Sequence, residues 1–161
     1  IRRRPQQETK PVNLMVPGNV LMVCLGNICR SPLAHGIFQN LVADQNIIVD
    51  SAGTANFHTG AAPDPRSIEI ASIKGIDISQ HHARQFKVED FDQFDYIYVM
   101  DKSNLQNVLQ LARTEEDRAK VSLLLGNAEV EDPYYGGTDG FAIVYDKIHI
   151  ACQYILDQWK N

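Results

Sequence analysis

The sequence predicts a single domain of the α/β class, with a four-stranded parallel sheet and helices on both of its faces. Short apolar runs alternate along the chain with amphipathic stretches, which is typical of repeated β-α units. The 161 residues suit one hydrophobic core rather than two. Hydrophobic residues make up 44% of the chain and charged residues 22%, so neither a disordered nor a fibrous protein fits.

Four apolar runs are short enough to be buried strands. We expect strands at 20–23, 47–49, 96–100 and 121–125. Each run is separated from the next by a stretch long enough for a crossover, so the strands are expected to run parallel. In such sheets ligands bind at the carboxyl ends of the strands, which places the end of the first strand among the candidate sites.

Apolar residues at steps of three and four predict the helices between the strands. Pro32 suits a first helical turn, Ser103 is a plausible N-cap, and Gly75 is a typical stop. The stripe from Phe141 to Trp159 predicts one long helix at the end of the chain, with its apolar side on the sheet. The predicted helices cover 32–43, 66–74, 103–112 and 141–159.

Residues 1–19 differ from the rest of the chain. They contain three consecutive arginines followed by a proline, and two further prolines, Pro11 and Pro17. They show neither helical nor strand periodicity. We predict a flexible arm or an expression remnant at 1–19 and the folded domain at 20–161. The arginines could alternatively contact a membrane or a partner.

Charge and cysteine content exclude several classes of protein. The net charge is −5, and the basic first 19 residues leave residues 20–161 still more acidic, which argues against nucleic acid as a partner. Three cysteines, Cys24, Cys29 and Cys152, are too few for a secreted disulfide framework, so we expect a cytoplasmic protein. No apolar run approaches 18 residues, so no membrane span is predicted.

The segment between the first predicted strand and helix is a candidate anion site. A cysteine, five residues, an arginine and a serine follow one another from Cys24 to Ser31. Five residues can wrap backbone N–H groups around a tetrahedral oxyanion, and the helix N-terminus adds partial positive charge. Gly26 permits close approach, Asn27 tolerates a left-handed conformation, and Arg30 offers a planar fork to two oxygens. The sequence thus predicts a phosphate-binding loop after the first strand.

The same loop is suited to nucleophilic chemistry. A field that binds an oxyanion also favours a thiolate, so Cys24 is expected to be a nucleophile near neutral pH. Ser31 can donate its hydroxyl to that sulfur, or it can cap the helix. The alternative for Cys24 is a buried small hydrophobe at the end of a strand.

A proton donor is needed if the sulfur is to displace an oxygen from phosphorus. Asp132 begins the string Asp-Pro-Tyr-Tyr just after the last predicted strand, again at the carboxyl edge of the sheet. It could protonate the departing oxygen and then take a proton from water. Taken alone, an Asp-Pro-Tyr-Tyr string is more often a turn with aromatic side chains on the surface.

These residues together resemble the low-molecular-weight protein tyrosine phosphatase family. The family pattern V-C-x-G-N-I-C-R-S-P is matched at 23–32 and D-P-Y-Y at 132–135. Further segments of the chain also resemble those of the family, at 50–54, 63–66, 81–85, 94–97 and 100–105. The resemblance covers about residues 20–161.

The resemblance implies a hydrolase without a cofactor. Hydrolysis would proceed through a phosphocysteine on Cys24, with Arg30 binding phosphate and Asp132 as acid and then base. Asn27, Ser51 and His81 would hold the loop by hydrogen bonds. Residues expected to contact the substrate are Leu25, Gly26, Asn27, Ile28, Cys29, Ser31, Phe57, Tyr134 and Tyr135.

The substrates implied are phosphotyrosine proteins or small aryl phosphates, with phosphate and other oxyanions as inhibitors. An apolar slot lined by Leu25, Ile28 and the aromatic residues would suit an aryl group. Relatives that hydrolyse phosphoarginine carry threonine at the position of Ile28, so isoleucine favours phosphotyrosine. In the family the neighbour at Cys29 can form a reversible disulfide with the nucleophile; the alternative is ordinary packing, which is also expected for Cys152.

Two other functions stay open at this point. A thiol-dependent arsenate reductase could share the loop, but it would need further cysteines, and the region 86–110 contains none. A phosphotyrosine-binding module without turnover would not need the acid. A zinc site from Cys24, Cys29, His81 and His82 has poor spacing, and no Walker-type phosphate loop occurs, so neither a metal nor a nucleotide is expected.

Overall fold

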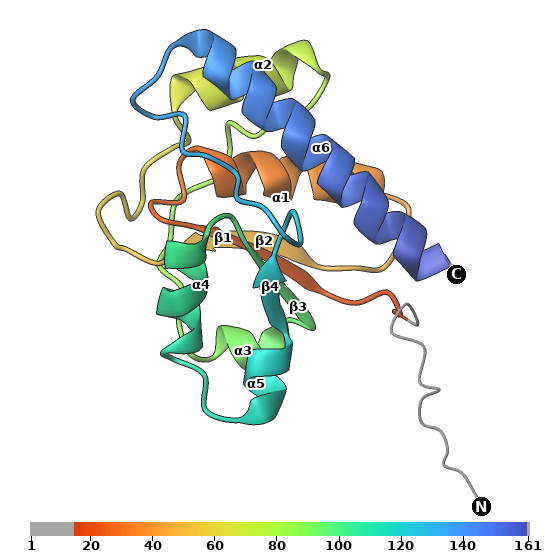
Figure 1. Ribbon diagram of the computed structural model, residues 1–161. Helices are drawn as coiled ribbons and strands as arrows, with labels where there is room; N and C mark the ends of the chain where they lie inside the picture. The colour runs from red at the N-terminus through yellow and green to blue at the C-terminus, as the bar shows by residue number, and fades with distance from the viewer. Residues whose placement is uncertain (1–14, 161) are drawn as a thin grey trace, which may run out of the picture.

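The computed structural model describes residues 15–160, and within that range it is an α/β domain built around one parallel sheet (Figure 1). In chain order the elements are β1 (Val20–Cys24), α1 (Arg30–Leu41), β2 (Val49–Gly53), α2 (Pro65–Ile73), α3 (Asp90–Gln93), β3 (Tyr96–Val99), α4 (Lys102–Leu109), α5 (Glu115–Ala119), β4 (Val121–Leu123) and α6 (Thr138–Lys160).

The sheet has the order β2-β1-β3-β4, and every neighbouring pair is parallel. This confirms the predicted four-stranded parallel sheet. β1 lies between β2 and β3, so its carboxyl end has a neighbouring strand on each side. Cys24, the last residue of β1, is paired with Gly53 at the end of β2. The loop that follows Cys24 therefore leaves from the middle of the sheet edge.

Helices cover both faces of the sheet, as predicted (Figure 1). Alternate residues of β1 enter two separate cores: Val20 and Met22 pack with α1 and α6, whereas Leu21 and Val23 pack with Phe91 of α3 and its neighbours. All four of these β1 side chains are fully buried. A strand buried on both faces is continuously apolar, which is why its sequence showed no alternation.

The predicted helices are confirmed, with small shifts at their ends. Pro65 opens α2, where Asp64 caps the helix, and Gly75 follows it with a φ of 86°. The N-cap of α4 is Asp101 and not Ser103, so that prediction was wrong. Asp101 accepts from the backbone of Asn104, whose side chain reaches back to complete a capping box. Ser103 lies inside the first turn.

The second strand was predicted too early. It runs over Val49–Gly53, whereas the apolar residues 47–49 suggested a strand ending where β2 begins. The pairing with β1 carries the strand through Asp50 and Ser51, two polar residues with little strand preference. Here tertiary pairing outweighs local preference, and it brings Ser51 beside the loop after β1. The short helices α3 and α5 were not predicted, because four or five residues are too few for a periodic pattern.

The described part of the predicted arm lies against the domain. Met15 packs against the core that contains Val20 and Met22, and the carbonyl of Val16 accepts a hydrogen bond from the Tyr96 hydroxyl. Asn19 bonds Asp95 and Ile48 at the start of the sheet. Residues 1–14 of the predicted arm lie outside the described residues. Among the helices at 15–160, none combines the length and apolar character that crossing a membrane requires.

Candidate active site

The segment 24–30, called the phosphate loop below, turns tightly between β1 and α1. Cys24 ends the strand and Arg30 begins the helix. Asn27, midway, has a φ of 59°, the left-handed conformation that asparagine tolerates better than most residues. Two polar groups approach the sulfur of Cys24: the Ser31 hydroxyl at 3.1 Å and the backbone N–H of Asn27, which donates at 3.3 Å. The N-cap position of α1 is Cys29, so Ser31 does not cap the helix.

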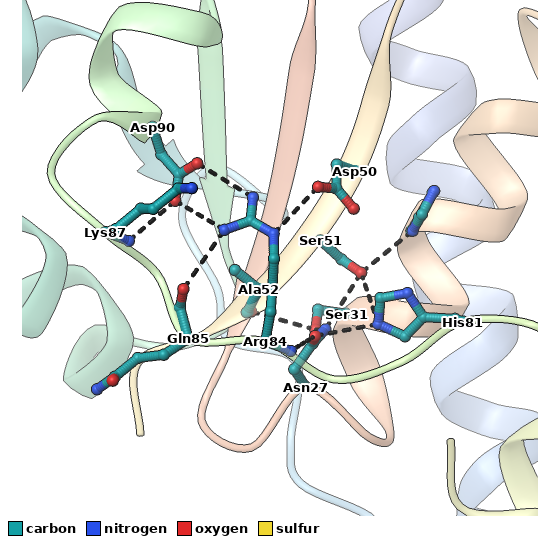
Figure 2. A network of polar contacts seen from close by, with 11 residues as sticks. Asn27, Ser31, Asp50, Ser51, Ala52, His81, Arg84, Gln85, Lys87 and Asp90 are labelled. Atoms are coloured by element: carbon teal, nitrogen blue, oxygen red, sulfur yellow. Dashed lines mark hydrogen bonds and ion pairs between the residues drawn. The ribbon is translucent and has the colours of Figure 1, made fainter. Parts of the chain in front are cut away.

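Asn27 holds the turn from inside the protein (Figure 2). Its side-chain NH2 donates to Ser31 Oγ at 2.7 Å and to Ser51 Oγ at 3.1 Å. Its side-chain carbonyl accepts from the backbone N–H of Arg84 at 3.0 Å and lies 3.0 Å from His81 Nε2. Asn27 is fully buried, and all four of these contacts fix a side chain that points away from the cavity. Its left-handed backbone is therefore held by neighbours on β2 and on the segment before α3.

Two histidines flank Ser51 on the far side of this network. Ser51 Oγ lies 3.1 Å from His35 Nδ1 and 3.3 Å from His81 Nε2. Burial, followed by the nearby His35, lowers the pKa of His81 to about 4. Burial is also the main cause that lowers the pKa of His35, against the opposing effect of Asp50. Both imidazoles are therefore neutral around pH 7.

Glycine at the end of β2 lets the phosphate loop pack closely. A Cβ on Gly53 would lie 2.7 Å from the backbone oxygen of Leu25 and 3.1 Å from the backbone nitrogen of Asn27. The contact of 2.7 Å is too short for a side-chain carbon and the one of 3.1 Å is tight, so any other residue at this position would displace the backbone of the loop. Gly53 N and O also pair with Arg84 and Phe86, which draws that segment onto the loop.

Arg30 is buried and held by its own side-chain contacts. Nη1 donates to Asp101 Oδ2 at 2.8 Å and to the carbonyl of Val130 at 2.9 Å. Nη2 lies 3.8 Å from Asp132 Oδ2. Burial disfavours the charged guanidinium, but Cys24, Asp101 and Asp132 outweigh it and raise the pKa of Arg30 above its usual value. The arginine thus stays charged, with Nη1 used for positioning and Nη2 directed at the cavity.

The phosphate loop forms the floor of a cavity of about 140 Å³. Its walls come from three places in the chain: the loop itself, residues 57–58, and the segment after β4. The lining residues are Cys24, Leu25, Gly26, Ile28, Cys29, Arg30, Phe57, His58, Asp132, Tyr134 and Tyr135. Phe57 and Tyr135 are largely exposed, at 73% and 92%, and form an aromatic rim rather than a closed wall.

The segment 130–137, called the acid loop below, carries Asp132 to the cavity. Asp132 Oδ1 accepts from the backbone N–H of Tyr134 at 3.0 Å, and the carboxylate is partly exposed. Arg66 of α2 ties this loop down, because its Nη2 donates to the carbonyl of Tyr134 and its Nη1 to that of Gly136. The guanidinium also lies over the rings of Tyr134 and Phe141.

Arg66 links the acid loop to the phosphate loop through Asp64. The Asp64 side chain accepts from Arg66 at 2.8 to 3.0 Å, and this bonding lowers the pKa of the carboxyl. The backbone N–H of Asp64 donates to the carbonyl of Ile28 in the phosphate loop. The N-terminus of α2 therefore contacts both loops that line the cavity.

Cys29 lies in the same loop as Cys24 but in a different environment. Burial is the main cause that raises its pKa to about 12, and the charge of Asp64 adds to it. It is a free thiol, as is Cys152, which is buried on α6 among core residues.

The structure brings the residues selected from the sequence to one place. Ten of them line the cavity, whereas Asn27, Ser31, Ser51 and His81 lie behind its floor and hold one another. Four residues with clear contacts were not selected: His35, His58, Asp101 and Arg66. Asp101 and Arg66 lie within the segments 100–105 and 63–66, whose resemblance to the family could have indicated them. No feature of the sequence indicated His35 or His58.

Comparisons with known proteins agree with this geometry. Residues 19–161 match the family model described as low molecular weight phosphotyrosine protein phosphatase. Relatives of that name are 40% identical in Sus scrofa, covering 89% of this chain and 96% of theirs, and 44% identical in Schizosaccharomyces pombe, covering 78% and 86%.

Solved structures give the same result. A protein tyrosine phosphatase from Entamoeba histolytica superposes with a TM-score of 0.83 at 32% identity, covering 89% of this chain and 97% of that one. A Drosophila arginine phosphatase superposes with a TM-score of 0.82 at 35% identity, covering 88% and 98%. The family match spans nearly the whole described chain, and the chain therefore belongs to the low molecular weight phosphotyrosine protein phosphatase family.

Proposed function

We propose that this protein hydrolyses phosphotyrosine, and small aryl phosphates, through a covalent phosphocysteine on Cys24. The observation that carries the proposal is the meeting of three groups in one cavity: the Cys24 sulfur on the floor, the free edge of Arg30 beside it, and the Asp132 carboxyl on the wall. A nucleophile, an anion-binding cation and a proton donor are what phosphoryl transfer to sulfur requires.

In the first step the Cys24 thiolate attacks phosphorus while the bond from phosphorus to the aryl oxygen breaks. The electron pair of that bond goes to the aryl oxygen, which takes the proton of Asp132 and leaves as a phenol. Backbone N–H groups of the phosphate loop and Arg30 Nη2 bind the three equatorial oxygens. The Ser31 hydroxyl, 3.1 Å from the sulfur, steadies the thiolate before the attack.

In the second step water attacks phosphorus and the bond between sulfur and phosphorus breaks. Asp132, now a carboxylate, takes a proton from that water, and the electron pair of the broken bond returns to Cys24. Phosphate leaves, and the enzyme is restored with its acid protonated. No electrons are exchanged with an external donor, so the chain needs no redox partner for this reaction.

The shape of the cavity supports an aromatic substrate. Leu25, Ile28 and Tyr134 give it apolar walls, and the exposed rings of Phe57 and Tyr135 extend them outward. An aryl ring can bridge the distance between rim and floor, whereas the short stem of phosphoserine leaves its phosphorus above the sulfur. We place the reaction in the cytoplasm, with phosphate and similar oxyanions as competitive inhibitors.

One set of variants tests the mechanism. We expect Cys24→Ser to abolish turnover of p-nitrophenyl phosphate and of a phosphotyrosine peptide while keeping phosphate binding in calorimetry. Cys29→Ser is the matched control in the same loop and should keep most activity. Rapid quenching of the wild-type chain should trap phosphate on Cys24. Substantial turnover by Cys24→Ser would contradict the proposed role of the Cys24 sulfur as the nucleophile.

Asp132→Asn tests the acid separately. Without the proton donor, phenols with a pKa of about 10 leave poorly, so their esters should slow by about 10²- to 10³-fold. Esters of acidic phenols should slow much less. Equal slowing across the leaving-group series would remove the acid role from Asp132.

The similarity to a Drosophila arginine phosphatase makes phosphoarginine a second candidate substrate. Ile28 favours phosphotyrosine, because its side chain offers the cavity only apolar surface and no hydroxyl to a guanidinium group. A direct comparison of phosphotyrosine and phosphoarginine peptides decides between them. We expect the ratio of kcat/KM to favour phosphotyrosine, and Ile28→Thr to lower that ratio.

Arsenate reduction is the remaining alternative. It needs a relay of thiols, yet the chain has three cysteines, and Cys152 is fully buried on α6 away from the cavity. We expect no arsenate-dependent oxidation of thioredoxin.

A further inference from the structure

Two histidines and an aspartate cluster behind the phosphate loop, outside the proposed catalytic cavity. His35 comes from α1, Asp50 from β2 and His81 from the segment between α2 and α3. Each offers one ligand atom, and these atoms all lie within 4.8 Å of one another. All three side chains are half-buried. Figure 2 shows Ser51 between Asp50 and His81, with its hydroxyl in contact with the His81 ring.

We propose that His35, Asp50 and His81 form a binding site for a divalent transition-metal ion such as Zn²⁺. Two imidazole nitrogens and a carboxylate oxygen are the donor set of three-ligand zinc sites, in which water takes the fourth position. Ligand atoms at about 2.0 to 2.2 Å from zinc lie roughly 3.3 Å apart, so atoms that are now as much as 4.8 Å apart must close by up to about 1.5 Å. Rotations of half-buried side chains can supply such a movement.

A second cavity gives the ion a route to this cluster. It has a volume of about 600 Å³, is open to solvent, and is lined by both His35 and His81. The cavity is separate from the one above Cys24, since the two share no lining residue. It therefore offers entry, and room for a water ligand, without passing through the catalytic cavity.

The charges around Asp50 also suit a cation. Arg84 forms an ion pair with Asp50, with Nε 3.1 Å from Asp50 Oδ2. The other two nitrogens of Arg84 face the carboxylate of Asp90, which is almost fully buried. Asp90 thus compensates the positive charge of the guanidinium. The two carboxylates and the one guanidinium together carry one negative charge, which is available to an incoming cation.

The site touches the phosphate loop through one residue. His81 Nε2 lies 3.0 Å from Asn27 Oδ1 and 3.3 Å from Ser51 Oγ. A bound ion that moves the His81 ring therefore changes its contacts with Asn27 and Ser51 first. Metal binding is nevertheless measurable without any turnover, so the proposal does not depend on the proposed function.

Calorimetric titration with Zn²⁺ tests the site. Because thiolates also bind zinc, the full chain should carry Cys24→Ser and Cys29→Ser in every sample. We expect one zinc ion per chain, and binding at least about tenfold weaker after His35→Ala or Asp50→Asn. His82→Ala is the matched control, since His82 lines the same cavity but lies outside the cluster, and it should change the affinity less than about twofold.

Nuclear magnetic resonance locates the ion independently of these variants. Zinc should shift the ring nitrogen signals of His35 and His81 in the otherwise unaltered double cysteine variant, and leave those of His58, His82 and His149 in place. The proposal is overturned if no zinc binds, if His35→Ala and Asp50→Asn bind as the parent does, or if the shifted signals belong to other histidines.

Discussion

The two loops that line the catalytic cavity are built in opposite ways. The phosphate loop is buried and braced: Arg30 is 3% exposed and bonded to two other segments, and Asn27 makes four contacts beneath the floor. The acid loop is anchored at its start by the buried Val130 and is more open beyond it: the Asp132 side chain is 38% exposed, and Arg66 of α2 holds the carbonyls of Tyr134 and Gly136. Rigidity is thus concentrated where an oxyanion binds.

The difference follows from what each loop has to do. Donors that stabilise a developing charge act best when they are already oriented, because no energy is then spent on turning them during the reaction. The acid must instead meet leaving groups of different sizes, which requires space at the rim. Substitutions in the phosphate loop should therefore affect all substrates, whereas those in the acid loop should affect substrates according to their leaving group.

The largest effect is expected at Arg30. Arg30→Lys keeps the positive charge but loses the planar fork, so one group can no longer hold Asp101, Val130 and the substrate together. We expect kcat/KM to fall by about 10²- to 10³-fold, equally for good and poor leaving groups. Steady-state kinetics on a series of aryl phosphates measures this. Arg118→Lys, at an exposed ion pair on α5, is the control and should be silent.

A fall in kcat/KM of less than about fivefold for Arg30→Lys would mean that a charge alone is sufficient there. The contrast between the two loops would then not rest on oriented donors.

A smaller loss is expected when the brace beneath the loop is removed. Asn27→Ala deletes four contacts and places alanine at a φ of 59°, a left-handed conformation that alanine tolerates less well than asparagine. We expect kcat to fall by about 10²-fold and the free energy of unfolding to fall by roughly 2 to 4 kcal/mol. Urea unfolding and kinetics on the same samples provide the measurement.

Asn27→Gly separates the two causes in that variant. Glycine relieves the backbone strain but makes no side-chain contacts, so it should recover about 1 kcal/mol of stability and little of the activity. Full recovery of kcat by glycine would show that the conformation, and not the hydrogen bonds, supports catalysis.

The acid loop should respond more weakly and more selectively. Arg66→Gln removes the donors to Tyr134 and Gly136 and the cation over the aromatic rings, without touching the cavity floor. We expect about a tenfold fall in kcat for esters of poor leaving groups and less than about threefold for good ones. Uniform slowing of both classes would indicate that Arg66 acts through Asp64 on the phosphate loop instead.

The contrast between the loops also explains what could be predicted from the sequence. Cys24, Arg30 and Ser31 lie within eight residues of one another, so their types and spacing alone indicated an anion site. Asp101 joins Arg30 across 71 positions in the chain, and Arg66 joins Tyr134 across 68. Such pairs depend on how the elements pack, which no local pattern encodes.

The same reason accounts for the cluster at His35. Its members come from a helix, a strand and a connecting segment, and β2 was expected to end before Asp50 entered it. Pairing with β1 extends the strand through Asp50 and Ser51 and places both beside α1. The misplaced strand boundary therefore left Asp50 out of the predicted strand, and only the resemblance to the family indicated Ser51 and His81.

The smallest effect is expected within the phosphate loop itself, between its two thiols. The pKa of Cys29, raised to about 12 chiefly by burial, leaves about one thiolate in 10⁴ at pH 8, so Cys29 should not react with iodoacetate at pH 7–8. We expect one equivalent of label, on Cys24, with phosphate slowing the reaction. Cys29→Ser should react at the same rate within about twofold, and Cys24→Ser should not react.

Mass spectrometry of the labelled peptide distinguishes the two sites, which lie five residues apart. Since the unfolded thiol ionises near pH 9 and the folded one only near 12, Cys29 stabilises the fold below about pH 9, and this contribution is lost as the pH rises toward 12. The Cys29→Ser variant should therefore lose less stability than the wild type between pH 9 and 10.5. Labelling of Cys29 at pH 7–8 would show instead that burial does not protect this thiol, and that the phosphate loop opens despite the contacts that brace it.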